Sequence, residues 1–196
     1  MDSAGIDAVV DDQWSRFGEA GTWLTGAERA ELTRIARSEA TPPDVKVPIR
    51  TAAVAVAHHA ATVTADLVDD LESRGVSREQ YVEIVGVVSR AIAIDTYDRG
   101  LGRELREVPA AGPGEPGRAT VAAARRRAGW VPTVGPIGPP TALDAVPAEA
   151  AAQESLHAVL YLSYPEMADL HAQRGLTRAQ MELVAARVSY LNDCLY

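Results

Sequence analysis

Gly75-Val-Ser-Arg-Glu-Gln80 and Gly175-Leu-Thr-Arg-Ala-Gln180 are two copies of one local pattern, and a helical stretch follows each of them. In both copies a hydroxyl residue stands three positions before a glutamine, an arrangement that caps the first turn of a helix. The glycine ahead of each cap is typical of the end of the preceding helix. The sequence therefore predicts an internal duplication of a helical unit.

The composition favours helices throughout the chain of 196 residues. Alanine is the commonest residue, with 35 copies, and aromatic residues make up only 5%. Alanine loses no side-chain entropy when it enters a helix, so this mixture predicts an all-α fold. The 47% of hydrophobic residues is enough to form a core.

Helix-capping residues and prolines predict where the helices begin and end. Thr25-Gly-Ala-Glu28 reads as a capping box, and we expect its helix to run until Pro42-Pro43. An apolar stripe from Ile49 to Leu71 predicts one long helix, with room for a bend near Thr64-Ala65-Asp66. Ser163-Tyr-Pro-Glu166 predicts a further capped helix in the second half.

A connector separates the two halves. Residues 107–147 hold eight of the 12 prolines, so we divide the chain into a first half at 1–106, this connector and a second half at 148–196. A loop of this length is uncommon inside a compact domain, and we expect it to lie on the surface or to cross a partner subunit. Trp130-Val-Pro132 is expected to hold it in place.

The charge argues against several classes of partner. The formal net charge is -8, which argues against binding to nucleic acid or to an anionic membrane. No apolar run reaches the length of a membrane helix, and the first residues do not resemble a signal peptide, so we expect a cytoplasmic protein. We expect Arg125-Arg-Arg127 to be a solvated face.

Glu182 and Cys194 are the candidate catalytic residues. They are 12 residues apart, which on a straight helix places them on one side but about 18 Å from each other. One interpretation makes Cys194 a redox thiol and Glu182 an acid-base residue reached through a relay. The other makes Cys194 a small core residue and Glu182 an exposed helix charge.

The register of the duplication has two solutions. A slip of one residue after the caps pairs Glu83 with Glu182 and Asp95 with Cys194. A gapless alignment from the two glutamines pairs Val82 with Glu182 instead.

The two helical stretches are similar to a known family. Val82-Glu-Ile-Val-Gly-Val-Val88 with Asp95-Thr-Tyr97, and Gln180-Met-Glu-Leu-Val-Ala-Ala-Arg-Val188 with Leu191-Asn-Asp-Cys194, resemble the alkylhydroperoxidase AhpD-like branch of the carboxymuconolactone decarboxylase superfamily. The resemblance extends over most of the chain. It implies a thiol-dependent peroxide-reducing, antioxidant oxidoreductase with an AhpD-like helical fold.

The resemblance also implies roles for individual residues. The family motif is a glutamate, then a Cys-x-x-Cys pair about a dozen residues later, then a histidine. Glu182 matches the glutamate and Cys194 matches the first, resolving cysteine. The sequence ends at Tyr196, before the positions of the second cysteine and the histidine, so we expect a poor peroxidase and a truncated copy of a longer protein.

The first half matches the family motif less well than the second half does. Asp95 and Asp98 stand at its cysteine positions and Gly102 at its histidine position, so we expect a degenerate, structural repeat. We expect the two aspartates to lie on a solvated helix face.

The resemblance implies a homo-oligomer, a trimer or a multiple of one, and a dithiol reductant as partner. No cofactor is expected. The alternative is a non-catalytic member of the superfamily in which the helices serve oligomerisation or partner binding. A decarboxylase or lactone activity is a third and weaker option.

The histidines offer no clear catalytic site. We expect His59 to flank the apolar stripe, His58 to face away from it, and His157 to be a hydrogen-bonded structural residue rather than a base. The sequence contains no H-E-x-x-H pattern, so a zinc site is not expected.

Overall fold

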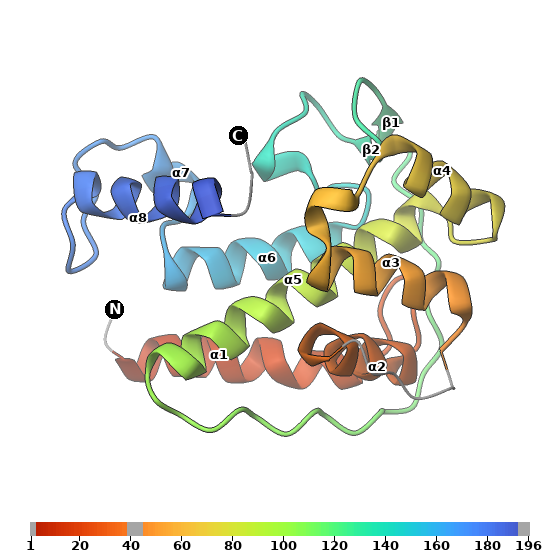
Figure 1. The fold of residues 1–196 in the computed structure, drawn as a ribbon, viewed down its shortest axis with the longest axis horizontal. Helices are drawn as coiled ribbons and strands as arrows, with labels where there is room; N and C mark the ends of the chain where they lie inside the picture. The colour runs from red at the N-terminus through yellow and green to blue at the C-terminus, as the bar shows by residue number, and fades with distance from the viewer. Residues whose placement is uncertain (1–2, 39–44, 192–196) are drawn as a thin grey trace.

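The fold is all-α, as the composition predicts. The computed structural model describes residues 3–38 and 45–191, and helices dominate them (Figure 1). The short strands β1 (Arg125–Arg126) and β2 (Pro132–Thr133) pair antiparallel in the connector.

The helices follow one another in two groups separated by the connector. The first group consists of α1 (Ser3–Ser15), α2 (Gly26–Arg37), α3 (Val47–His58), α4 (Ala65–Ser73) and α5 (Arg78–Gly100). The second consists of α6 (Pro147–Leu160), α7 (Tyr164–Met167) and α8 (Arg178–Leu191). Short 3₁₀ turns occur at Arg16–Gly18, Ala60–Thr62 and Pro139–Thr141.

Helix α5 is the centre of the packing. It crosses the middle of the molecule in Figure 1 and packs against α2, α3 and α6. Its residues are buried on several sides, among them Tyr81, Ile84, Val88, Ala91 and Ile94. The surrounding helices therefore enclose α5 on several sides, and its buried side chains are charged as well as apolar.

Helix α2 begins as predicted but ends earlier. Thr25 accepts a hydrogen bond from the Glu28 amide and the Glu28 carboxylate accepts one from the Thr25 amide, which confirms the capping box. The expectation that the helix runs to Pro42-Pro43 is wrong, because it ends at Arg37 where Ser38 turns to extended backbone. The two prolines lie outside the described residues.

The single helix predicted from Ile49 to Leu71 is also wrong. The chain forms α3 and α4 instead, with a 3₁₀ turn between them. The Thr64 hydroxyl accepts a hydrogen bond from the Leu67 amide and starts a new helix there. The break lets Ile49 on α3 and Leu71 on α4 both reach the core.

The order of elements in the first half recurs in the second. Helices α3, α4 and α5 correspond in order to α6, α7 and α8, and Gly75 and Gly175 both have left-handed backbone, with φ of 91° and 75°. The hydroxyls of Ser77 and Thr177 each accept a hydrogen bond from the amide of the glutamine three residues later. The duplication itself stays a prediction.

The helix caps can be compared with the two possible alignments of the halves. If the two caps are equivalent, Tyr81 corresponds to Met181, and both side chains are buried. The slipped alignment pairs Met181 with Val82, which is buried as well, so burial does not distinguish the two alignments.

The connector runs over the surface of its own chain. The Gly112 amide donates to the Gly18 carbonyl at 2.8 Å, and the Trp14 indole N–H donates to the Glu107 carbonyl at 2.7 Å. Residues 130–132 hold the connector against the helices, as expected, because Val131 packs against the core and the Trp130 carbonyl accepts a hydrogen bond from Arg78. The Trp130 side chain itself is 42% exposed.

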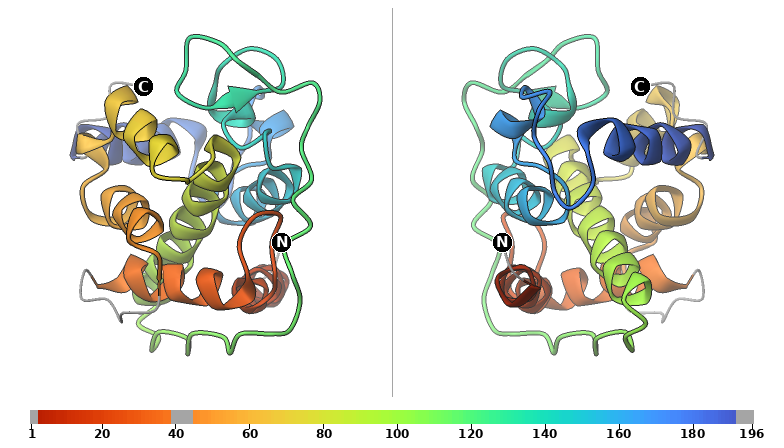
Figure 2. Two further views of the ribbon diagram at one scale, coloured as in Figure 1. Left: turned by 90° about the vertical axis from the view of Figure 1, so that its right-hand side faces the viewer. Right: turned by 90° about the vertical axis from the view of Figure 1, so that its left-hand side faces the viewer.

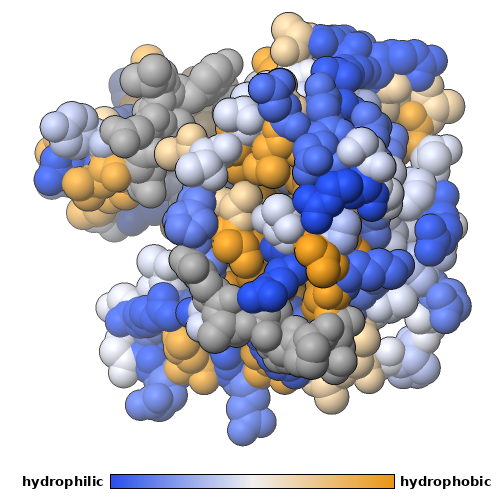
Figure 3. Space-filling view, turned by 45° about the vertical axis from the view of Figure 1, so that its right-hand side comes forward, coloured by the Kyte–Doolittle hydropathy of each residue, from blue (hydrophilic) through white to orange (hydrophobic). Residues whose placement is uncertain are grey.

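Helices α7 and α8 form a lobe apart from the other helices. The main helix pairs are α2–α5, α3–α5, α2–α3 and α1–α6, and α8 belongs to none of them. The views in Figure 2 place α8 at the outside of the molecule, and Figure 3 shows the lobe standing out from the main body. Within Arg178–Leu191, Met181 is the one buried residue.

We predict that Thr25→Ala lowers the free energy of unfolding by about 1 kcal/mol, because it removes the side-chain acceptor of the α2 capping box. Urea unfolding followed by circular dichroism measures the change. Thr120→Ala is the control, since Thr120 is exposed in the connector and starts no helix. Equal stability of the two variants would contradict the prediction.

Candidate functional site

Glu182 lies on the outer lobe. Its carboxylate accepts hydrogen bonds from the Tyr161 hydroxyl at 2.9 Å and from Arg178 Nε at 2.6 Å. These bonds, the one from Tyr161 first, lower the pKa of Glu182 below its usual value. The side chain is half exposed, so its proton can exchange with solvent.

Cys194 lies outside the described residues. The structure therefore places Glu182 and its two hydrogen-bond donors, but not the thiol of the predicted site.

The two aspartates of the degenerate motif are buried, which corrects the expectation of a solvated face. Arg37 donates to both carboxylate oxygens of Asp95 at 2.8 Å, and Arg106 Nε donates to Asp98 at 2.8 Å. Buried carboxylates are tolerated when a hydrogen-bonded cation neutralises them. The two aspartates thus join α5 to α2 and to the segment that follows α5.

A second set of buried charges lies where α2, α5 and α6 meet, and we call it the charge quartet: Arg29, Glu83, Arg90 and Glu149. Arg29 Nη1 donates to Glu83 at 2.6 Å and to Glu149 at 2.8 Å. Arg90 donates to the other oxygen of Glu149, and its Nε donates to the Gly86 carbonyl at 3.1 Å. Two cations and two anions therefore neutralise each other in the core.

Glycines make room for the quartet. A Cβ atom on Gly21 would stand 1.8 Å from Glu83 Oε1, and one on Gly86 would stand 2.6 Å from Glu149 Oε2. Any larger residue at either position would displace a carboxylate from its arginine. These glycines are required for the close approach of backbone and charge.

Burial shifts the pKa values of two members of the quartet. It raises the pKa of Glu83. Arg29 and the Trp23 amide, which donates to the Glu83 carboxylate at 2.6 Å, oppose this shift. It lowers the pKa of Arg90. Glu83 is therefore easier to protonate than an exposed glutamate.

A small cavity of about 310 Å³ adjoins the quartet, and Arg29, Arg90 and Glu149 contribute to its lining. Arg29 Nε has no hydrogen-bond partner among the described residues. The pairing of the quartet cannot be seen in the sequence, which places Glu83 only in the alignment of the two halves. A charged residue between Val82 and Ile84, both at core positions, was the available signal.

The histidines make backbone contacts. His58 Nε2 is 2.7 Å from the Ile35 carbonyl, so the expectation that His58 faces away from the packed helices is wrong. His157 Nδ1 is 2.5 Å from the Leu162 carbonyl, which fits a structural role. Within residues 3–38 and 45–191 no three side chains of the metal-binding types come together.

Comparisons with protein-family models, with curated proteins and with solved structures find no match to this chain. None of the helices in the described ranges combines the length and the apolar content needed to cross a membrane.

We predict that Arg29→Met lowers the free energy of unfolding by about 3–5 kcal/mol, because it leaves a buried negative charge uncompensated. Adding Glu83→Gln restores the charge balance, so the double variant should lose less than the sum of the two single variants. Urea unfolding of the four proteins measures this coupling.

Arg74→Met is the control in an exposed ion pair. Arg74 pairs with Asp70, and the two side chains are 39% and 53% exposed, so the loss of Arg74 should cost no more than about 1 kcal/mol. Equal losses for Arg29→Met and Arg74→Met would show that the quartet does not stabilise the fold.

Proposed function

We propose that the chain is an AhpD-like, thiol-dependent peroxide-reducing protein whose chemistry belongs to the second half. One observation carries the proposal beyond the resemblance. Glu182, at the position that matches the family glutamate, accepts a hydrogen bond from the Tyr161 hydroxyl, which comes from a different helix end. A carboxylate with a hydroxyl partner can take part in proton transfer.

Cys194 has the role of the resolving thiol in this proposal. A peroxidatic thiolate reduces the hydroperoxide to an alcohol and becomes a sulfenate. The sulfenate takes up a proton to become a sulfenic acid, and the Cys194 thiolate then attacks its sulfur, which forms a disulfide and releases hydroxide. A dithiol partner reduces the disulfide and is itself oxidised to a disulfide.

The 196 residues contain one cysteine, so the peroxidatic thiol has to come from outside them. Low turnover by this chain alone is therefore part of the proposal. Glu182 is anionic at neutral pH, as glutamates are at their ordinary pKa. It would act as the proton acceptor, and its lowered pKa makes it a weak base, which agrees with low turnover.

We predict that the chain accelerates the oxidation of glutathione by tert-butyl hydroperoxide, in which glutathione supplies the outside thiol. This acceleration should be lost in Cys194→Ser and reduced roughly tenfold or more in Glu182→Gln. The glutathione disulfide formed is measured by NADPH consumption with glutathione reductase. Glu115→Gln should retain the wild-type rate, since Glu115 is exposed in the connector. A rate in Cys194→Ser equal to that of the wild type would refute the thiol mechanism.

A second function, a non-catalytic interaction module, is favoured by the outer face of α8. Its exposed apolar side chains are Leu183, Val184, Val188, Tyr190 and Leu191. Apolar side chains gathered on one helix are typical of a surface that packs against a partner. We propose that in this case the partner is a second copy of the chain, in keeping with the expected trimer or higher oligomer.

We predict that Leu183→Glu shifts the chain toward a monomer, because it places a charge in the α8 face. Leu183 is 71% exposed, so the variant should fold. Sedimentation velocity at several concentrations gives the mass. Val47→Glu, at a residue that is 66% exposed on α3, is the control and should keep the wild-type mass. A wild-type protein that is monomeric at all concentrations would eliminate this function.

A further inference from the structure

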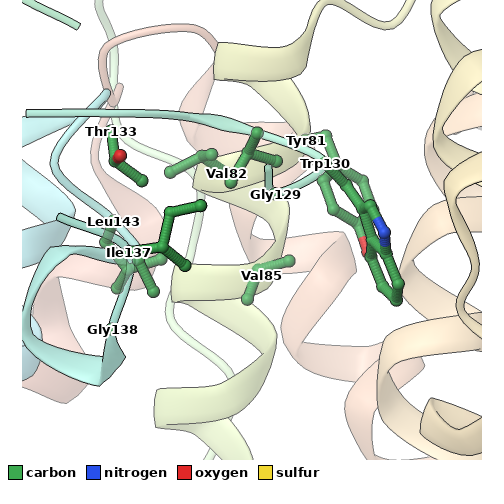
Figure 4. A pocket seen from close by; sticks show the side chains of 11 residues that line it. Tyr81, Val82, Val85, Gly129, Trp130, Thr133, Ile137, Gly138 and Leu143 are labelled. Carbon is green, nitrogen blue, oxygen red and sulfur yellow. The ribbon is translucent and has the colours of Figure 1, made fainter. Parts of the chain in front are cut away.

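An apolar hollow lies between the start of α5 and residues 129–143 of the connector. Its volume is about 440 Å³, within the roughly 300–1,000 Å³ usual for sites that bind small molecules. Tyr81, Val82 and Val85 line it from α5, and the connector lines it with Trp130, Val131, Thr133, Ile137 and Leu143 (Figure 4). The site uses neither Glu182 nor Cys194 and does not depend on the proposed peroxide chemistry.

The polar groups around the hollow bind one another. The Thr133 hydroxyl donates to the Gly135 carbonyl at 3.2 Å, and the Thr141 hydroxyl donates to the Pro136 carbonyl at 2.6 Å. The Gly138 amide donates to the Thr141 hydroxyl at 3.1 Å. These hydrogen bonds stay within the connector, so the lining left for a ligand is carbon.

The wall is also uncharged. Burial raises the pKa of the Tyr81 hydroxyl to about 12, so Tyr81 remains neutral at physiological pH. No lysine, arginine, aspartate or glutamate belongs to the lining. A charged ligand would lose its hydration without gaining a partner.

The hollow is kept open by contacts behind its wall. Arg78, at the start of α5, donates to the Trp130 carbonyl and pairs with Glu72 at 3.0 Å. The pairing of β1 with β2 fixes Thr133 opposite Arg125. The wall is thus tied to the helices, which suits a preformed site.

Two large apolar side chains stand at the mouth. Trp130 is 42% exposed and Ile137 is 47% exposed. Val82 and Leu143 are buried within the lining, where they belong to a small apolar cluster beside the main core. The lining therefore combines two exposed side chains, Trp130 and Ile137, with buried aliphatic ones such as Val82 and Leu143.

We propose that this hollow binds a neutral, hydrocarbon-like small molecule. Its recognition rests on shape and on apolar contact, with the ring of Trp130 at the entrance.

The test is a fluorescence titration of the whole chain with N-phenyl-1-naphthylamine, a neutral apolar probe. We expect saturable binding, and we expect Ile137→Glu to weaken it about tenfold because a carboxylate then stands at the mouth. Val85→Trp, which fills the hollow, should abolish it. Ile137 is on the surface, so its variant tests the site even if the Val85 variant fails to fold.

Val134→Glu is the matched control. Val134 belongs to the same loop and is 37% exposed, but it does not line the hollow, so binding should change less than about twofold. Leu183→Glu on α8 should also leave binding unchanged. Loss of binding in Leu183→Glu with retention in Ile137→Glu would place the probe on α8 and overturn the proposal, as would the absence of saturable binding.

Displacement of the bound probe by a neutral and by an anionic ligand of equal chain length tests the proposed ligand class. Decan-1-ol should displace the probe at a concentration at least about tenfold lower than decanoate, since the lining has no cation for a carboxylate. Stronger displacement by decanoate would show that the site recognises an anion, and the proposed ligand class would be wrong.

Discussion

The charge quartet is the constraint on which the arrangement of the helices depends. Each of its ions is too costly to bury alone, so the four side chains must meet for any of them to leave water. Arg29 on α2 and Glu149 on α6 are separated by 120 residues, yet their charged atoms lie 2.8 Å apart. This pairing fixes α6, the first helix after the connector, against the helices of the first half.

The path of the connector follows from that pairing. The chain leaves α5 at Gly100 and has to return to the middle of the same helix, where Glu149 meets Arg90. A proline-rich segment over the surface can make this return without leaving backbone polar groups buried and unpaired. The apolar hollow beside α5 is a consequence, because the returning segment covers the start of the helix with apolar side chains while its polar groups bind each other.

The local features could be predicted from the sequence, and the distant pairings could not. The capping boxes at Thr25 and Ser163 depend on residues three positions apart, and both form. The burial of Asp95 depends on Arg37, which is 58 residues away, and no helical spacing reveals that contact. A carboxylate on a helix is expected to be exposed to solvent unless its cation partner is known. For this reason the sequence predicts that Asp95 and Asp98 lie on a solvated helix face.

The two halves have the same order of elements but differ in where the ion-pair partners of their last helices lie. Helix α5 carries carboxylates at Glu83, Asp95 and Asp98, and arginines from other segments pair with each of them. Helix α8 carries Glu182, whose arginine partner lies one turn away on α8 itself. Tyr161 donates to Glu182, and Arg178 donates to carbonyl groups of α7 and of the turn after it. These contacts reach only elements of the second half, so they do not hold α8 against the first half. Both proposed functions of the second half, the thiol chemistry and the oligomer, therefore depend on what the exposed apolar face of α8 contacts.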